Sequence, residues 1–117
     1  MLPPEEFDCI VEEAVRLIPR RFRRRMNNVA IVVELEPPRP GLLGLYQGRP
    51  LASRSVFDSF ALPDKITIYQ GPHERMARNP AELRQMVADT VWHEIAHHFG
   101  MNEERVRRAE RARRKPR

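Results

Sequence analysis

His93, Glu94 and His97 form the pattern H-E-x-x-H. Successive residues of an α-helix are rotated by about 100°, so the two histidines would lie one turn apart and about 40° apart around the axis. Both imidazoles could then reach one metal ion, and neutral imidazoles favour zinc over magnesium or calcium, which prefer oxygen ligands. Glu94 would flank that ion, where it could accept a proton from metal-bound water. The motif therefore predicts hydrolytic zinc chemistry, with His93 and His97 as ligands and Glu94 as general base.

A catalytic zinc site also needs a third protein ligand and an open position for water. The motif continues as H-E-x-x-H-x-x-G-x-x-E, with Glu103 at the position where metzincin peptidases have a third histidine. Gly100 permits a sharp turn, so a residue three positions later could return to the metal. We predict Glu103 as the third ligand. Glu104 and Glu110 stay open as alternatives, and Glu103 and Glu104 could instead only stabilise the start of a following helix.

The other polar candidates have less specific patterns. A regular helix directs His98 away from the two motif histidines, so we expect a hydrogen-bonded structural histidine. His73 follows a Gly-Pro pair, and we expect it in a loop, either as an ordinary loop histidine or above the cleft as a group that stabilises an oxyanion. Three further side chains that could polarise a substrate carbonyl are Tyr46, Arg54 and Tyr69.

The motif lies in the clearest helix of the sequence. Asn79 is a good N-cap, Pro80 suits the first helical position, and Glu82 can complete a capping box. The pattern predicts a helix that runs through Phe99 and ends at Gly100. Apolar residues surround most of its axis, which predicts a buried helix; these residues are Val87, Ala88, Val91, Trp92, Ile95, Ala96 and Phe99.

A first helix and three strands should precede the motif helix. Apolar spacing between residues 7 and 18 predicts an amphipathic helix that Pro19 ends or bends, with Cys9 packed on its apolar face. Residues 28–36 and 65–70 have strand patterns, and 42–47 form a shorter strand candidate between glycines. We expect an irregular connection from residue 49 to 64. A last short helix should begin near Asn102.

Length and composition limit the remaining possibilities. The 117 residues fit one small domain, expected over residues 1–108, followed by a flexible basic tail at 109–117. A hydrophobic content of 41% supports a folded core, and the single cysteine excludes an internal disulfide or a thiolate metal site. The apolar runs are too short to cross a bilayer, and no signal-peptide pattern is visible. We therefore expect a cytoplasmic protein without a membrane partner.

The net charge of +5 does not indicate a nucleic-acid partner. Residues 103–117 carry the whole excess, whereas residues 1–102 are balanced, including an arginine cluster at 20–25. Such basic runs are usually solvated helix ends and termini. No aromatic residue lies within 103–117, so bases would have no stacking platform there. The sequence does not determine the oligomeric state.

Residues 7–107 resemble the small bacterial zincin-like metallopeptidases, which are minimal single-domain zincins. The resemblance rests on residues 26–34, 41–51, 62–69 and above all 90–100, which read T-V-W-H-E-I-A-H-H-F-G. It implies an α+β fold with an N-terminal helix, a small twisted mixed β-sheet, the H-E-x-x-H helix and a short C-terminal helix. It also implies zinc ligands at the two motif histidines, a glutamate base, and an acidic third ligand near position 103. That acid is usually aspartate in the family and is glutamate here.

The motif and the resemblance together predict a zinc metallopeptidase that acts on peptide or protein substrates. Glu94 would take a proton from the attacking water and deliver it to the leaving amine. By analogy with zincin architecture, the substrate would lie along the edge strand at 42–47, whose glycines permit close approach. The alternative is a zincin-fold protein that binds zinc without efficient proteolysis, as a binding or structural module, because so small a chain offers little wall for a substrate.

Overall fold

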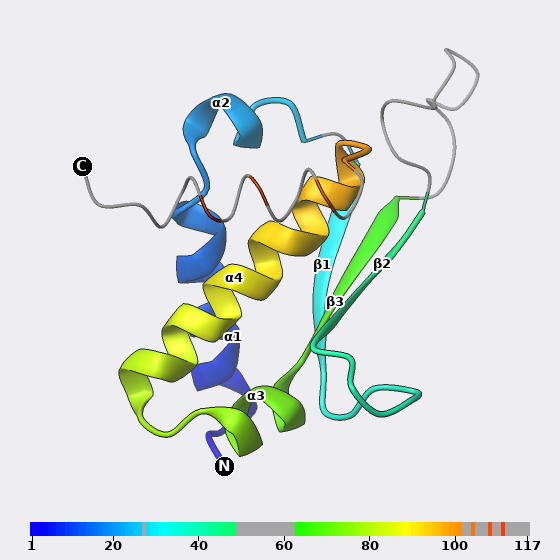
Figure 1. Ribbon diagram of the computed structural model, residues 1–117. Coiled ribbons are helices and arrows are strands. Elements are labelled where there is room, and N and C mark those ends of the chain that lie inside the picture. Colours follow the sequence, from blue (N-terminus) through cyan, green and yellow to red (C-terminus); the bar gives the residue numbers. More distant parts are fainter. Residues whose placement is uncertain (27, 49–62, 102–103, 105–107, 109–110, 112–117) are drawn as a thin grey trace.

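The computed structural model describes residues 1–26, 28–48, 63–101, 104, 108 and 111 (Figure 1). Its helices are α1 (Pro4–Arg16), α2 (Arg20–Arg23), α3 (Gln70–Met76) and α4 (Pro80–His98). Its strands are β1 (Val29–Glu34), β2 (Gly44–Gln47) and β3 (Asp64–Tyr69). The predicted α+β class is confirmed. None of the helices in these ranges has the length and apolar character needed to cross a membrane.

β3 is the central strand of a mixed three-stranded sheet with the order β1-β3-β2. It pairs in parallel with β1, with Val29 opposite Asp64, and antiparallel with β2, with Gly44 opposite Ile68. The chain thus places β1 and β2 at opposite sides before β3 fills the space between them. β2 is therefore an edge strand of the described sheet, which is the position expected of a substrate-binding strand.

The helices lie on one side of the sheet, where α4 packs against α1, β2 and β3 (Figure 1). Alternation along β3 directs Ile66 and Ile68 into this layer, and both are fully buried. α1 contributes Phe7 and Val11 at helical spacing. The prediction that α4 is buried around much of its axis is confirmed by its buried residues, which are Leu83, Val87, Ala88, Thr90, Val91, Trp92, Glu94, Ile95, Ala96 and His98.

The ends of α4 follow from their capping residues. The Asn79 side chain accepts a hydrogen bond of 2.8 Å from the backbone N–H of Glu82, and Pro80 is the first helical residue. The Glu82 carboxylate accepts from the backbone N–H of Arg78 at 3.1 Å, one residue earlier than in the usual capping box. Gly100 follows the helix with a φ of 85°, in the left-handed region that glycine adopts without a Cβ clash.

Two local predictions are wrong. Cys9 is exposed rather than packed, because it lies about 200° around α1 from the buried Phe7. Residues 70–76 form α3 rather than a loop. Pro72 is compatible with this helix because it lies in the first turn, where a backbone N–H has no intrahelical acceptor. Residues 20–23 form α2, a helix that was not predicted.

Candidate metal centre

The imidazoles of His93 and His97 converge on successive turns of α4. Their Nε2 atoms lie 3.3 Å apart, and their rings meet edge to face with centroids 4.9 Å apart. Two nitrogens bound to one tetrahedral zinc at about 2.0–2.1 Å are themselves about 3.3–3.4 Å apart. Imidazole nitrogen is also a ligand that zinc favours. The pair therefore fits a zinc ion in both chemistry and separation.

Glu94 and His93 face a cleft between α4 and the chain that enters β2. The cleft has a volume of about 310 Å³. The Glu94 side chain is largely buried, so its carboxylate lies inside the protein wall rather than on an open surface. The motif thus supplies one metal-ligand candidate and the base candidate to the same cleft. Its other lining residues are Asp89, Thr90 and residues 41–44.

Gly44 sets how closely β2 approaches α4. A Cβ at this position would lie 2.8 Å from Cγ2 of Thr90, 3.1 Å from Cγ of Glu94 and 3.2 Å from the backbone oxygen of Thr67. These separations are shorter than ordinary van der Waals contact, so a larger residue would force the strand and the helix apart. Glycine therefore allows the edge strand to lie directly beside the candidate base.

A buried carboxylate connects the C-terminal end of α4 to the sheet. Oδ2 of Asp64 accepts a hydrogen bond from the Tyr46 hydroxyl at 2.5 Å and lies 2.8 Å from Nδ1 of His98. Asp64 and His98 are 3% and 0% exposed, so both polar groups depend on this contact for part of their hydrogen bonding. Since His98 directly follows the ligand candidate His97, Asp64 fixes the helix end next to that ligand. His98 is the hydrogen-bonded structural histidine that the spacing predicted.

His73 is not a group above the cleft. It lies in α3, fully buried, with Nδ1 2.6 Å from the backbone oxygen of Tyr69 and Nε2 2.8 Å from Oγ1 of Thr90. Burial lowers the pKa of His73, which favours the neutral ring. The neutral ring would donate from Nδ1 to the Tyr69 carbonyl, which leaves Nε2 as an acceptor facing the Thr90 hydroxyl; that hydroxyl also lies 3.0 Å from the backbone oxygen of Met86, to which it can donate. The oxyanion hypothesis is therefore wrong, and His73 instead supports Thr90 in the cleft wall.

The proposed carbonyl-polarising side chains are absent from the described lining of the cleft. The Tyr46 hydroxyl bonds to Asp64, and Tyr69 is 2% exposed. Burial raises the pKa of Tyr69, and the nearby carboxylates of Glu34 and Glu94 raise it further. Arg54 lies outside the described residues.

Glu103, the predicted third ligand, and Glu110 also lie outside the described residues. Glu104 has a helical backbone and an exposed side chain that accepts a hydrogen bond of 2.5 Å from Arg108, one turn later. Within the described ranges, no group of three or more His, Cys, Asp or Glu side chains is arranged to hold a metal ion. The described donor set is therefore the pair of motif imidazoles.

Sequence reasoning missed Asp64 and Thr90. Asp64 had a usable signal, because it occupies the same alternating face of β3 as Ile66 and Ile68. An acidic side chain on the buried face of a strand requires a hydrogen-bonding partner. Thr90 had no such signal, because its contact with His73 depends on α3, which was not predicted.

Comparisons with known proteins agree with this arrangement. The family described as zincin-like metallopeptidase matches residues 26–112, which include all three strands and the motif. A solved structure, a conserved hypothetical protein from Thermus thermophilus, superposes with a TM-score of 0.57. It is 28% identical and covers 82% of this chain and 92% of its own. No curated protein matches the chain.

Proposed function

The chain belongs to the zincin-like metallopeptidase family, and we propose that it is a zinc-dependent peptidase acting on peptide or protein substrates. The observation that carries this proposal is the convergence of the His93 and His97 Nε2 atoms to 3.3 Å beside a cleft that Glu94 also lines. Bound between these imidazoles, zinc would lower the pKa of a coordinated water to about 7 and polarise a substrate carbonyl.

Glu94 acts as the proton carrier. It follows His93 in the helix and faces the same cleft, so its carboxylate can accept the proton of the attacking water. The same group then delivers that proton to the amine that leaves when the peptide bond breaks. The close packing of Gly44 against the Glu94 side chain supports this role, because it restricts where the carboxylate can lie.

The substrate binds in extended form along β2. In the described sheet β2 pairs with β3 on one edge only, so among the described residues no strand lies along its other edge, where a further strand could add. A peptide that adds to this edge gains main-chain hydrogen bonds whatever its sequence. The position of Gly44 beside Glu94 would bring such a peptide next to the base.

Glu103 is our proposed third ligand. It lies three residues after Gly100, whose left-handed conformation turns the chain at the end of α4. The ion pair between Glu104 and Arg108 supports Glu103 over its neighbour, because the Glu104 carboxylate already has a cationic partner. A carboxylate together with two imidazoles leaves the fourth zinc position open for water.

The test combines zinc content with peptide cleavage. We expect about one zinc per wild-type chain and loss of zinc in His93→Ala and His97→Ala, because two ligands hold zinc far more weakly than three. Glu94→Gln should keep its zinc, whereas its cleavage rate should fall by about 10²–10⁴. Equal cleavage by wild type and Glu94→Gln at equal zinc content would refute the mechanism. Full zinc binding without cleavage by either protein would favour the non-proteolytic zinc module.

A further inference from the structure

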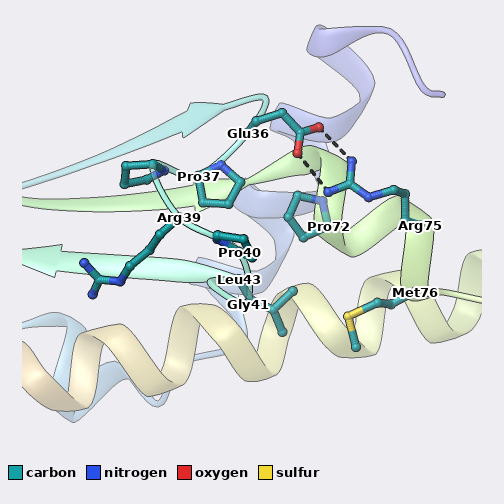
Figure 2. Close-up of a pocket in the computed structure, with 10 residues that line it drawn as sticks. Glu36, Pro37, Arg39, Pro40, Gly41, Leu43, Pro72, Arg75 and Met76 are labelled. Carbon is teal, nitrogen blue, oxygen red and sulfur yellow. Dashed lines mark hydrogen bonds and ion pairs between the residues drawn. The ribbon is translucent and has the colours of Figure 1, made fainter.

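A dense positive charge lies at α2. Five exposed arginines occupy this helix and the two residues after it; they are Arg20, Arg21, Arg23, Arg24 and Arg25. Within the described ranges none of them forms an ion pair. Arg75, in contrast, donates to both carboxylate oxygens of Glu36, at 2.7 and 2.8 Å (Figure 2). Positive charges so close to one another repel, so an external anion would stabilise this cluster.

The Phe22 side chain anchors α2 to the C-terminal end of α4. Its ring packs against the rings of Trp92 and Phe99, with centroids 5.5 and 5.8 Å apart. Successive helical residues differ by about 100°, so Arg20 and Arg24 each lie about 160° around the axis from Phe22. The anchor therefore directs these two positions away from the protein. α2 lies at the opposite end of the molecule from α3 (Figure 1), so the charges are presented on a projecting end.

An exposed leucine adjoins the arginines. Leu17 directly follows α1 and is 66% exposed, although its side chain is large and apolar. The turn between Leu17 and α2 is held by Arg23, whose Nε donates to the backbone oxygen of Ile18 at 3.0 Å. We name Leu17 and the five arginines the α2 patch. Cations beside an exposed apolar side chain are a combination typical of proteins that bind the surface of a bilayer.

The α2 patch is less suited to a nucleic acid. Proteins that bind single strands without sequence preference stack the bases on exposed aromatic rings. Phe22 is the aromatic residue of this segment, but its ring packs on α4 and has the Arg21 guanidinium 5.0 Å from its centroid. An exposed leucine contributes nothing to phosphate binding, whereas it can enter the apolar layer of a membrane. The composition of the patch therefore favours a lipid surface.

We propose that the α2 patch binds the surface of a bilayer that contains anionic phospholipids. The guanidiniums contact the lipid phosphates, for which their paired N–H groups are suited, and Leu17 enters the interface. The expected absence of a membrane partner rested on the lack of a spanning segment and of a signal peptide, and a surface contact needs neither. This inference goes beyond the proposed peptidase and depends on neither zinc nor cleavage.

Co-sedimentation of the full chain with lipid vesicles tests the α2 patch. The vesicles contain phosphatidylcholine alone or phosphatidylcholine mixed with the anionic lipid phosphatidylglycerol. We expect the wild type to bind only the mixed vesicles, and to bind them less as the salt concentration rises. The double variant Arg20→Gln, Arg24→Gln should lower the partition coefficient about tenfold to thirtyfold. The control Arg39→Gln, Arg84→Gln removes the same charge from exposed arginines outside the patch and should lower it less than about threefold.

A second variant separates a membrane from other polyanions. Leu17→Ser should weaken binding to the mixed vesicles about threefold to tenfold and leave binding to a DNA duplex unchanged. The basic tail at 109–117 is present in every protein compared, so the differences report the patch. Equal vesicle binding by the wild type and the Arg20→Gln, Arg24→Gln variant would refute the proposal, as would no binding to the mixed vesicles. Tighter binding to the duplex than to the mixed vesicles, with no effect of Leu17→Ser on either, would assign the patch to nucleic acid instead.

Discussion

Replacement of Asp64 by alanine should destabilise the fold and loosen the end of the motif helix. Asp64 is the first residue of β3. Its carboxylate accepts a hydrogen bond from the hydroxyl of Tyr46 in β2 and contacts His98 in α4. Alanine removes the acceptor for both groups and provides no substitute. His98 is fully enclosed, so water cannot readily reach its ring nitrogen to replace the lost partner.

The expected magnitude follows from these two contacts. A hydrogen bond to a charged group contributes about 1.5–3 kcal/mol, and an unsatisfied buried partner adds a comparable cost. We therefore expect a loss of about 3–5 kcal/mol in the free energy of unfolding. That is a large part of the 5–15 kcal/mol typical of a small domain. At roughly 4 °C per kcal/mol for a chain of this size, Tm should fall by about 10–20 °C.

Thermal and urea unfolding of the metal-free protein measure this effect without any contribution from zinc. Asp8→Ala removes an exposed carboxylate from α1 and serves as the matched control, with an expected change within about 0.5 kcal/mol. Tyr46→Phe deletes one of the two bonds and should cost about 1–2 kcal/mol. A Tm for Asp64→Ala within about 2 °C of wild type would refute the argument that this carboxylate holds β2, β3 and α4 together.

Three further predictions concern the cleft, the third ligand and the buried histidine. Gly44→Val should lower the cleavage rate at least tenfold and the free energy of unfolding by about 1–3 kcal/mol, because the valine side chain would overlap Thr90 and Glu94. Peptide assays measure the first effect and urea unfolding the second. Unchanged activity would contradict the close packing. Glu103→Ala should weaken zinc affinity much more than Glu104→Ala in competition with a chelator, and the reverse ranking would move the ligand by one residue. The pKa of His73 is lowered in the folded state, so the unfolded chain binds the proton more readily. The free energy of unfolding of the wild type should therefore fall as the pH drops below about 6.5, by up to 1.4 kcal/mol per pH unit. Urea midpoints between pH 5 and 8 should show a shallower slope for His73→Gln, and identical slopes would refute a buried neutral ring.

The parts of the site that depend on residues close together in the sequence could be predicted from the sequence. Asn79, Pro80 and Gly100 act within one turn of the helix ends, so their identity was enough to place α4. The strands were likewise recognisable from their alternation and from the prolines and glycines around them. Cys9 was predicted to be packed because cysteine is apolar, but it is exposed. Its angular position on α1, which the same helical rules give, decides its exposure.

α3 could not be predicted by these rules because Gly71 and Pro72 are residues that usually interrupt regular structure. Tertiary contacts stabilise this short helix instead. His73 bonds to Thr90 of α4, the Gln70 side chain donates to the backbone oxygen of Leu2 at 2.9 Å, and the Glu74 carboxylate accepts from the backbone N–H of Leu2 at 2.8 Å. Partners so distant in sequence leave no periodic pattern, so both the helix and the role of His73 became visible only in the folded chain.

Metal binding and substrate positioning therefore have different physical origins in this protein. His93 and His97 converge because four residues of straight helix bring any two side chains together, and this holds whatever the rest of the fold does. The location of β2 beside Glu94 depends instead on packing at Gly44 and on Asp64, whose hydrogen-bond partners lie 18 and 34 residues away. The ligand pair is consequently a property of the local sequence, whereas the cleft that selects a peptide is a property of the tertiary structure.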